Sequence, residues 1–345
     1  MPVICWNNNV QNMAASKRQM AWGNAMDTRL LKYFMRVIET GSISRAARQL
    51  GVAQPALSQY VAALEVDFNA KLLFRSTRGV TATAAGQVLY RYAQQMLRLL
   101  DQAHEAITTT GGTIAGRVTL GLPPGTTQSP LPINIIRQLS QRFPGIALNI
   151  HEGPSSDLRA LLLDSRIDLA IICNWADDPS IVLYPLFSEE LRFVGTMDLT
   201  ANLNPLQPIS CAEMNEFDLI LPGRDQDLRK LIDQAFAREG LAPHAVHESD
   251  SLQLSCLALK SGLGGTFLSS GLLAVIGHEL GCRDFATKPA IWTNMCLGVS
   301  TETPMNEPTT AVLELIVATV QDMLSSGTWP GVSKCRQPAV LNFVP

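Results

Sequence analysis

The chain has 345 residues, 46% of them apolar and 17% charged, and a formal net charge of −3 at pH 7. This composition is that of an ordinary globular protein of two or three domains, which excludes low-complexity and strongly charged classes. The longest uncharged apolar stretch, residues 261–277, is interrupted by glycines and hydroxyls, so it is interpreted as core and not as a membrane span. The seven cysteines include no C-x-x-C pair, which favours free thiols in a reducing cytoplasm.

The charge is distributed unevenly along the chain. Residues 26–110 carry ten Lys or Arg and six Asp or Glu, whereas residues 111–345 carry fifteen basic and twenty-four acidic residues. A small basic domain followed by a larger acidic one suits a nucleic-acid-binding module joined to a partner domain.

Three short helices are predicted near the start of the chain, from apolar residues at helical spacing over residues 30–38, 43–50 and 56–64. Gly41 and Gly51 end the first two helices. Ser42 or Ser44 can cap the second helix, and Pro55 lies in the first turn of the third, where no backbone donor is lost. Two helices joined by so tight a turn form a predicted helix-turn-helix.

A hairpin and a long helix follow. Two short strands are predicted over residues 72–81, around a turn that contains Gly79, and this hairpin has the place of a wing. Residues 87–107 form a predicted long helix whose apolar positions recur every three or four residues, as in a coiled-coil seam. We therefore expect a second copy of the chain to pair along this helix, and packing on its own domain is the alternative. The pairing residues would be Tyr92, Met96, Leu99 and Ala103.

The side chains at the start of the third helix suit DNA recognition. In a helix-turn-helix these residues meet base edges in the major groove, where a Gln amide can bond adenine and an apolar group can contact the thymine methyl. Arginines around a wing turn can reach phosphates or a narrow minor groove. The predicted DNA-binding residues are Ser44, Arg45, Gln54, Pro55, Ala56, Ser58, Gln59, Arg75 and Arg78.

Strands and helices alternate through the rest of the chain. A Gly- and Thr-rich linker precedes this region, and the alternation runs from about residue 117 to residue 326. Such alternation predicts parallel sheets flanked by helices, and this length is comfortable for two sheets.

From about residue 26 to residue 326 the chain resembles LysR-type transcriptional regulators, most specifically in their N-terminal domain, and the 25 residues before this range have no counterpart in the family. The elements A-A-x-x-L, Q-P-A-L-S, L-E, L-F-R and T-x-x-G occur in order between residues 46 and 86, and Gln59 stands where many members have arginine. The segments AQPALSQ, RGVTATAAG, LPPGTTQS, HEGPSSDL and FVGT are most similar to the nitrogen assimilation control proteins of this family. The resemblance implies a DNA-binding regulator, in bacteria, of genes such as those of nitrogen or carbon metabolism.

The resemblance also implies an architecture and partners. The expected fold is α+β and multidomain, with a two-lobed effector domain like periplasmic binding proteins, a ligand cleft between the lobes, and two chain crossings. Dimers or tetramers would bind an interrupted palindrome in double-stranded DNA and contact RNA polymerase. The expected divisions are a mobile extension (1–25), a winged helix-turn-helix (26–85), a linker helix (86–108), a hinge (109–115), an effector domain (116–326) and a tail (327–345). Lobe I would comprise residues 116–187 and 290–326, and lobe II residues 188–289.

Several residues are candidates for binding a small anionic effector, such as a carboxylate. Thr126, Thr127 and Gln128 precede a predicted helix, whose N-terminus favours anions. Arg224 and Arg229 follow a strand and could hold a carboxylate in bidentate fashion. Thr266 follows the pair Gly264-Gly265. These residues also suit ordinary loops of an α/β protein, and a regulator that works without any co-inducer is an alternative.

The sequence contains no recognisable catalytic or metal-binding motif. None of its His-Glu pairs continues as H-E-x-x-H, and no G-x-S-x-G or G-x-x-x-x-G-K segment occurs. Glu189 and Glu190 are adjacent, so on a strand they would face apart, and we interpret them as ordinary surface or core. We therefore expect no metal, cofactor or catalysis. An α/β enzyme with an appended DNA-binding domain is the alternative of another class, and oxidant sensing through Cys173 or Cys282 is a further one.

Overall fold

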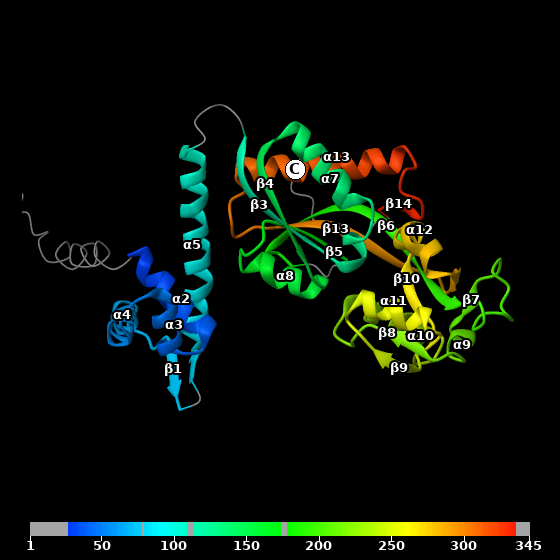
Figure 1. Ribbon diagram of the computed structural model, residues 1–345, viewed down its shortest axis with the longest axis horizontal. Coiled ribbons are helices and arrows are strands. Elements are labelled where there is room, and N and C mark those ends of the chain that lie inside the picture. The colour runs from blue at the N-terminus through cyan, green and yellow to red at the C-terminus, as the bar shows by residue number, and fades with distance from the viewer. Residues whose placement is uncertain (1–26, 78, 109–113, 174–177, 336–345) are drawn as a thin grey trace, which may run out of the picture. The chain divides into compact units, whose positions relative to one another are not determined.

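The computed structural model describes residues 27–77, 79–108, 114–173 and 178–335 (Figure 1). The chain forms two compact units, which divide between Asp101 and Gln102 within a long helix. Each unit has a hydrophobic core of its own. The predicted extension over residues 1–25 lies outside the described residues, as does most of the predicted hinge over residues 109–115.

The first unit consists of helices and a hairpin. Its elements are α2 (Thr28–Thr40), α3 (Ile43–Leu50), α4 (Gln54–Asp67), β1 (Leu73–Ser76), β2 (Gly79–Ala82) and the first part of α5 (Ala84–Thr108). The predicted helices and hairpin are confirmed, although α5 begins three residues before the predicted start. Ser42 caps α3 by accepting a hydrogen bond from the Arg45 N–H. Gly41 and Gly51 end α2 and α3 in the left-handed conformation.

These helices enclose one core. Phe34 of α2, together with Leu57 and Val61 of α4, is fully buried in it, and α5 contributes Leu89 and Ala93. Since one face of α4 supplies buried residues, its opposite face remains in solvent.

Two contacts fix the hairpin to the helices. The buried Glu65 carboxylate, near the end of α4, accepts hydrogen bonds from the N–H groups of Leu72 (2.9 Å) and Leu73 (3.3 Å). Gly79 has a φ of +130°, and a Cβ there would lie 2.7 Å from the carbonyl oxygen of Gly41. Only glycine fits this approach of the wing to the end of α2.

The described residues of the second unit form an eight-stranded mixed sheet. Its order is β10-β6-β13-β5-β3-β4, and β11 and β14 also pair with β6. The strands are β3 (Ala115–Leu122), β4 (Gly145–Glu152), β5 (Leu169–Cys173), β6 (Ile181–Thr196), β10 (Thr266–Ser269), β11 (Cys282–Phe285), β13 (Ile291–Ser300) and β14 (Val332–Lys334). β3 pairs in parallel with β4 and β5, whereas β13 pairs antiparallel with β5 and β6.

This topology corrects the prediction of two parallel sheets. β6 and β13 run through both lobes, so they join the lobes into one sheet (Figure 1). They run antiparallel because one carries the chain out of the first lobe and the other carries it back. The predicted lobe boundary at residue 187 accordingly falls inside β6, which continues unbroken to Thr196.

Helices and short strands complete each lobe. Lobe I holds α6 (Pro124–Thr127), α7 (Leu131–Arg142), α8 (Ser155–Leu163) and α13 (Glu307–Ser325). Lobe II holds α9 (Cys211–Met214), α10 (Asp227–Arg238), α11 (Leu252–Lys260), α12 (Ser270–Leu280) and the strands β7 (Ile209–Ser210), β8 (Leu219–Leu221), β9 (Ala245–Glu248) and β12 (Thr287–Lys288). The core of lobe I includes Leu120 and Ile316, and that of lobe II includes Phe193 and Phe236.

The end of the chain departs from the predicted tail over residues 327–345. Trp329 is 3% exposed and packs on Phe187, with ring centroids 4.6 Å apart. β14 then adds to the edge of β6. Residues 327–335 are therefore part of the second unit, and residues 336–345 lie outside the described residues. Within the described ranges, no helix is both long and apolar enough to span a bilayer.

Candidate nucleic-acid interface and ligand cavity

The start of α4 presents polar side chains to solvent. Gln54, Pro55 and Gln59 are exposed, and Ala56 and Ser58 are half-buried. Ala53, the residue before the helix, makes no side-chain cap, so the first N–H groups of α4 have no side-chain partner from it. This surface offers amide, hydroxyl and backbone donors along one short helical face, which is the chemistry that base edges and phosphates accept.

The wing lies beside this helix. Nη1 of Arg75, on β1, donates a hydrogen bond to Oγ of Ser58 on α4 at 3.1 Å. The structure thereby brings together two predicted DNA-binding residues from separate elements. Ser44 and Arg45 are exposed in the first turn of α3, and Arg78 lies outside the described residues.

Helix α5 has two apolar faces. One face is buried in the first unit through Leu89 and Ala93, and Met96 packs against the same core. The other face remains exposed, with Tyr92 57% accessible and Leu99 41%. Along that face lie Val88, Tyr92, Leu99, Leu100, Ala103 and Ile107, a set that we call the α5 stripe. Met96, predicted to pair with a second copy, is thus half-buried against its own unit.

A cavity of about 160 Å³ lies between the two lobes of the second unit. Lobe I contributes Thr126, Ser155 and Cys173 to its wall, and lobe II contributes Asp227 and Asp250. The crossing strands also line the cavity, β6 through Glu189 and Leu191 and β13 through Thr293 and Met295. Among the described residues, β6 and β13 are the long strands that run through both lobes, and lobes joined in this way can change their relative position when a ligand binds between them.

Two family models match the chain. The model of the bacterial regulatory helix-turn-helix protein, lysR family, matches residues 28–87, and the LysR substrate binding domain matches residues 111–321. The nitrogen assimilation regulatory protein nac of Klebsiella aerogenes is 32% identical over 296 residues, which are 86% of this chain and 95% of that protein. Its namesake in Escherichia coli (strain K12) is 31% identical over 310 residues, 89% of this chain and all of that protein.

The chain belongs to the LysR family. It is a DNA-binding transcriptional regulator and not an enzyme. Its first unit matches the helix-turn-helix model of this family, and the two relatives, which align with it over nearly their whole length, are regulatory proteins. Solved structures share its fold. Full-length CbnR in complex with target DNA has a TM-score of 0.64 at 18% identity, covering 86% of this chain and 99% of CbnR. A full-length variant of OxyR from Pseudomonas aeruginosa has a TM-score of 0.63 at 22% identity, covering 86% of this chain and 95% of OxyR.

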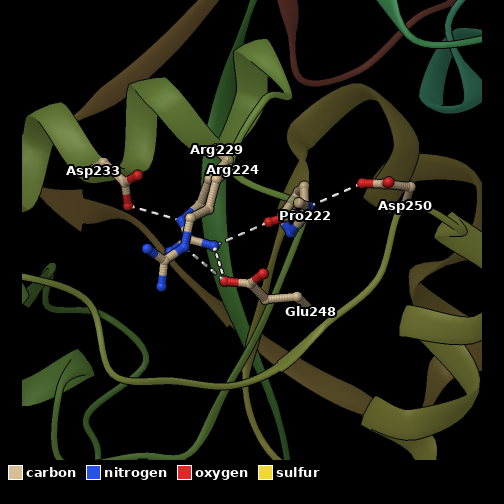
Figure 2. Close-up of polar contacts among 7 residues, drawn as sticks. Pro222, Arg224, Arg229, Asp233, Glu248 and Asp250 are labelled. Carbon is tan, nitrogen blue, oxygen red and sulfur yellow. Dashed lines mark hydrogen bonds and ion pairs between the residues drawn. The ribbon is translucent and has the colours of Figure 1, made fainter.

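The two arginines predicted to bind the effector do not line the cavity of this LysR-family regulator. Nε of Arg229 bonds Asp233 at 2.8 Å, and its Nη1 bonds Glu248 at 2.9 Å and the Pro222 carbonyl at 3.1 Å (Figure 2). The Arg229 side chain is only 6% exposed, whereas that of Arg224 is 81% exposed and contacts Glu248 at 3.4 Å. Both guanidinium groups are engaged within lobe II, and neither lines the cavity.

Two of the four remaining candidates do line the cavity of this LysR-family protein. Thr126 and Thr266 are buried in its wall, and the Thr266 hydroxyl donates to the Ile220 carbonyl at 2.7 Å. Thr127 and Gln128 do not line it. The Thr127 hydroxyl instead contacts Glu152 and the carbonyl of Pro124.

A buried glutamate in the cavity was not expected. Glu189 is 8% exposed and lines the cavity, and its carboxyl group accepts hydrogen bonds from the Ser269 hydroxyl and the Gly271 N–H. Burial raises the pKa of Glu189 to about 7, although these hydrogen bonds act in the opposite direction. The pair Glu189-Glu190 gave no signal of this role, because only the strand pairing decides which of the two faces the cavity.

Cys173 and Cys282, the two cysteines considered for oxidant sensing, are poor candidates for that role. Burial raises the pKa of the Cys173 thiol to about 11, and it also raises the pKa of Cys282. A thiol with a raised pKa holds little of the reactive thiolate at neutral pH. All six cysteines in the described chain are free thiols. No group of three or more His, Cys, Asp or Glu among the described residues is arranged to hold a metal ion.

Proposed function

We propose that this regulator binds promoter DNA as a homodimer or tetramer, with one α4 helix in the major groove at each half-site of an interrupted palindrome. A small-molecule effector bound in the inter-lobe cavity then changes how the assembly acts on transcription. The observation that carries the DNA-binding part is the exposed polar start of α4, with Arg75 of the wing bonded to Ser58 on the same surface.

Base recognition is assigned to the exposed residues of this surface. The Gln54 amide can donate to and accept from adenine in bidentate fashion, and Gln59 lies one turn and a half further along. Pro55 and Ala56 offer apolar contact to a thymine methyl. Arg75, with Arg78 beyond the described residues, supplies phosphate contacts that position the helix without reading sequence. Ser44 and Arg45 add contacts from the first turn of α3.

Pairing is assigned to the α5 stripe. One short helix contacts only a few base pairs, so two copies on two half-sites are needed for useful affinity. The α5 stripe is an apolar surface on a helix whose opposite face is already buried, which is what a second copy of the helix would cover.

The regulated genes are inferred from relatives. Two relatives above 30% identity are named nitrogen assimilation regulatory proteins, so we assign the targets to nitrogen metabolism, with contact to RNA polymerase at the promoter. The effector role rests on a cavity within the part of the chain that matches the LysR substrate binding domain. The carboxylate class expected from Arg224 and Arg229 loses its support, because neither arginine lines this cavity.

The test is a selection of bound genomic fragments followed by titration of the preferred site. Gln54→Ala should relax the preference at one base pair of each half-site by roughly 1–3 kcal/mol, because a bidentate amide contact is lost. Gln87→Ala removes an exposed glutamine of α5 and should leave the preference unchanged.

Indifference of the full-length chain to every double-stranded fragment at low salt would overturn the proposal. Equal effects of Gln54→Ala and Gln87→Ala at all positions would overturn the assignment of α4 to base reading.

A further inference from the structure

Three carboxyl groups line the cavity, and two cations outside its lining, Lys230 and Arg159, lie close to one of them, Asp227. Glu189, Asp227 and Asp250 line it, and none of the described residues in its lining is Lys, Arg or His. A ligand carboxylate would enter this space beside other carboxyl groups and would find no cation among the described lining residues to pair with.

Two of the helix N-termini at the cavity, those of α10 and α12, already hold a carboxyl group of the protein itself. Helix N-termini attract anions, and both α10 and α12 begin at the cavity. At the start of α12, the Glu189 carboxyl group accepts hydrogen bonds from the Ser269 hydroxyl and the Gly271 N–H. At α10 the first residue is Asp227 itself. A helix end carries roughly half a positive elementary charge, so a carboxyl group of the protein placed on it reduces its attraction for a further anion.

One carboxylate oxygen in the wall is open to a donor. Oδ1 of Asp227 is held by Lys230 Nζ at 3.2 Å. Its Oδ2 is buried and accepts no hydrogen bond from the described residues, and Nη2 of Arg159 in lobe I lies 4.0 Å away. A buried carboxylate oxygen is strongly stabilised by a hydrogen-bond donor. A ligand that places a donor against Oδ2 of Asp227 would therefore bind favourably.

The volume sets the size of that ligand. A cavity of about 160 Å³ matches the roughly 150 Å³ that accommodates a benzene-sized molecule. The buried part of the ligand should therefore have about six non-hydrogen atoms.

We infer that the cavity binds a compact ligand whose buried end is an amine or another cationic hydrogen-bond donor, with Glu189 and Asp227 as its acceptors, and that it rejects carboxylates of the same size. This inference rests on the proposed role of the cavity as the effector site. The cation would lie between Glu189 on β6 and Asp227 in the first turn of α10, beside the lining residues of lobe I.

Binding of an amine in the cavity should depend on pH. A cation pairs with the ionised form of Glu189, whose pKa burial raises to about 7. The other titratable groups that line the cavity are the Cys173 thiol on β5, Asp227 on α10 and Asp250, which precedes α11. Neither β13 between Ile291 and Met295 nor the first turn of α12 contains a charged residue, and Lys334 of β14 is exposed. Amine affinity should therefore rise about tenfold from pH 6 to pH 8, with a carboxylate showing the opposite trend.

The experiment is calorimetric titration of the full-length chain. The probes are ethylamine, isobutylamine and 1,4-diaminobutane, matched with propionate, isovalerate and succinate, each at pH 6, 7 and 8. Glu189→Gln should weaken amine binding at least tenfold and abolish its pH dependence, and Asp227→Asn should weaken it at least tenfold. Glu216→Gln is the matched control, because Glu216 is an exposed lobe II carboxylate outside the cavity wall, and it should bind like the unmodified chain.

The outcomes separate the inference from the proposed function. Carboxylate binding without amine binding, affinity that rises as pH falls, or no binding of any amine would overturn the inference. DNA binding measured on the same preparations decides the proposed function independently, since the carboxylates in the cavity are not part of the α4 surface.

Discussion

At the scale of single residues, the partners of a buried charge decide whether it can bind a ligand. Arg229 and Arg224 lie five positions apart in one sequence segment that looks suited to gripping a carboxylate. In the fold, Arg229 is enclosed by two carboxylates and a carbonyl of its own lobe, whereas Arg224 extends into solvent. Arg229 is consequently a structural residue that holds the start of α10 to β9.

Replacing these two arginines should give unequal costs. Arg229→Met should destabilise the chain by about 1–3 kcal/mol, because three charge-assisted or carbonyl hydrogen bonds are lost. The cost stays below that of a fully buried pair, since Asp233 and Glu248 are about 40% exposed and can be hydrated. Arg224→Met should change stability by less than about 1 kcal/mol, as exposed pairs do. Urea unfolding of both variants measures the difference, and equal costs would contradict this assignment.

Glu65 gives a prediction for pH. Burial opposes its ionisation, but hydrogen bonds from Leu72 N–H, the Lys71 ammonium and Leu73 N–H outweigh burial and lower its pKa. A lowered pKa contributes stability that is present above the unfolded value of about 4.3 and is lost as pH falls through the folded pKa. Glu65→Gln should destabilise the first unit by about 1–3 kcal/mol at pH 7, and by progressively less below about pH 4.

Thermal unfolding across this pH range checks the Glu65 prediction. The control is Asp67→Asn, which removes an exposed carboxylate from the same helix. A Glu65→Gln deficit that stays constant down to pH 2 would show that the charge of Glu65 is not what binds the two N–H groups.

At the scale of elements, the position of the wing depends on a single close approach. The hairpin turn passes the end of α2 so closely that a Cβ at Gly79 would meet the carbonyl oxygen of Gly41, and the φ of Gly79 is one that other residues rarely adopt. Gly277, in the middle of α12, has open space around it and a φ outside the left-handed region.

The two glycines should therefore respond oppositely to alanine. Gly79→Ala should destabilise the first unit by about 1–3 kcal/mol and weaken DNA binding, because the wing must move away from α2. Gly277→Ala should stabilise the chain by about 0.4–1 kcal/mol, since it lowers the entropy of the unfolded chain without strain. Calorimetric melting of both variants is the measurement, and a neutral Gly79→Ala would refute the close approach.

At the scale of the whole molecule, the two faces of α5 differ. Its buried face completes the core of the first unit, and the α5 stripe is the exposed surface that we propose for pairing with a second chain. A charge in the stripe should consequently weaken association without unfolding the monomer.

Tyr92→Glu tests this. It should raise the dimer dissociation constant at least tenfold, because a desolvated carboxylate would face apolar side chains. Leu206→Glu places the same charge on a loop residue that is 91% exposed, and it should leave association unchanged. Sedimentation equilibrium measures both, and a Tyr92→Glu chain that still dimerises normally would remove α5 from the interface.

The sequence alone determined what depends on near neighbours. Helical spacing, the caps at Gly41 and Gly51, and Pro55 predicted the helices of the first unit, and the ordered LysR motifs predicted the family. Strand-helix alternation likewise predicted most elements of the second unit, because each element follows from residues a few positions apart.

Only the tertiary structure decided how distant segments meet. β6 and β13 pass unbroken through both lobes, Trp329 returns the chain end to the core, and Arg229 turns away from the cavity that Glu189 enters. The physical reason is that strand direction, and the partners of a buried charge, are set by residues far away in sequence. No spacing or composition within one segment records which of two adjacent glutamates will be enclosed.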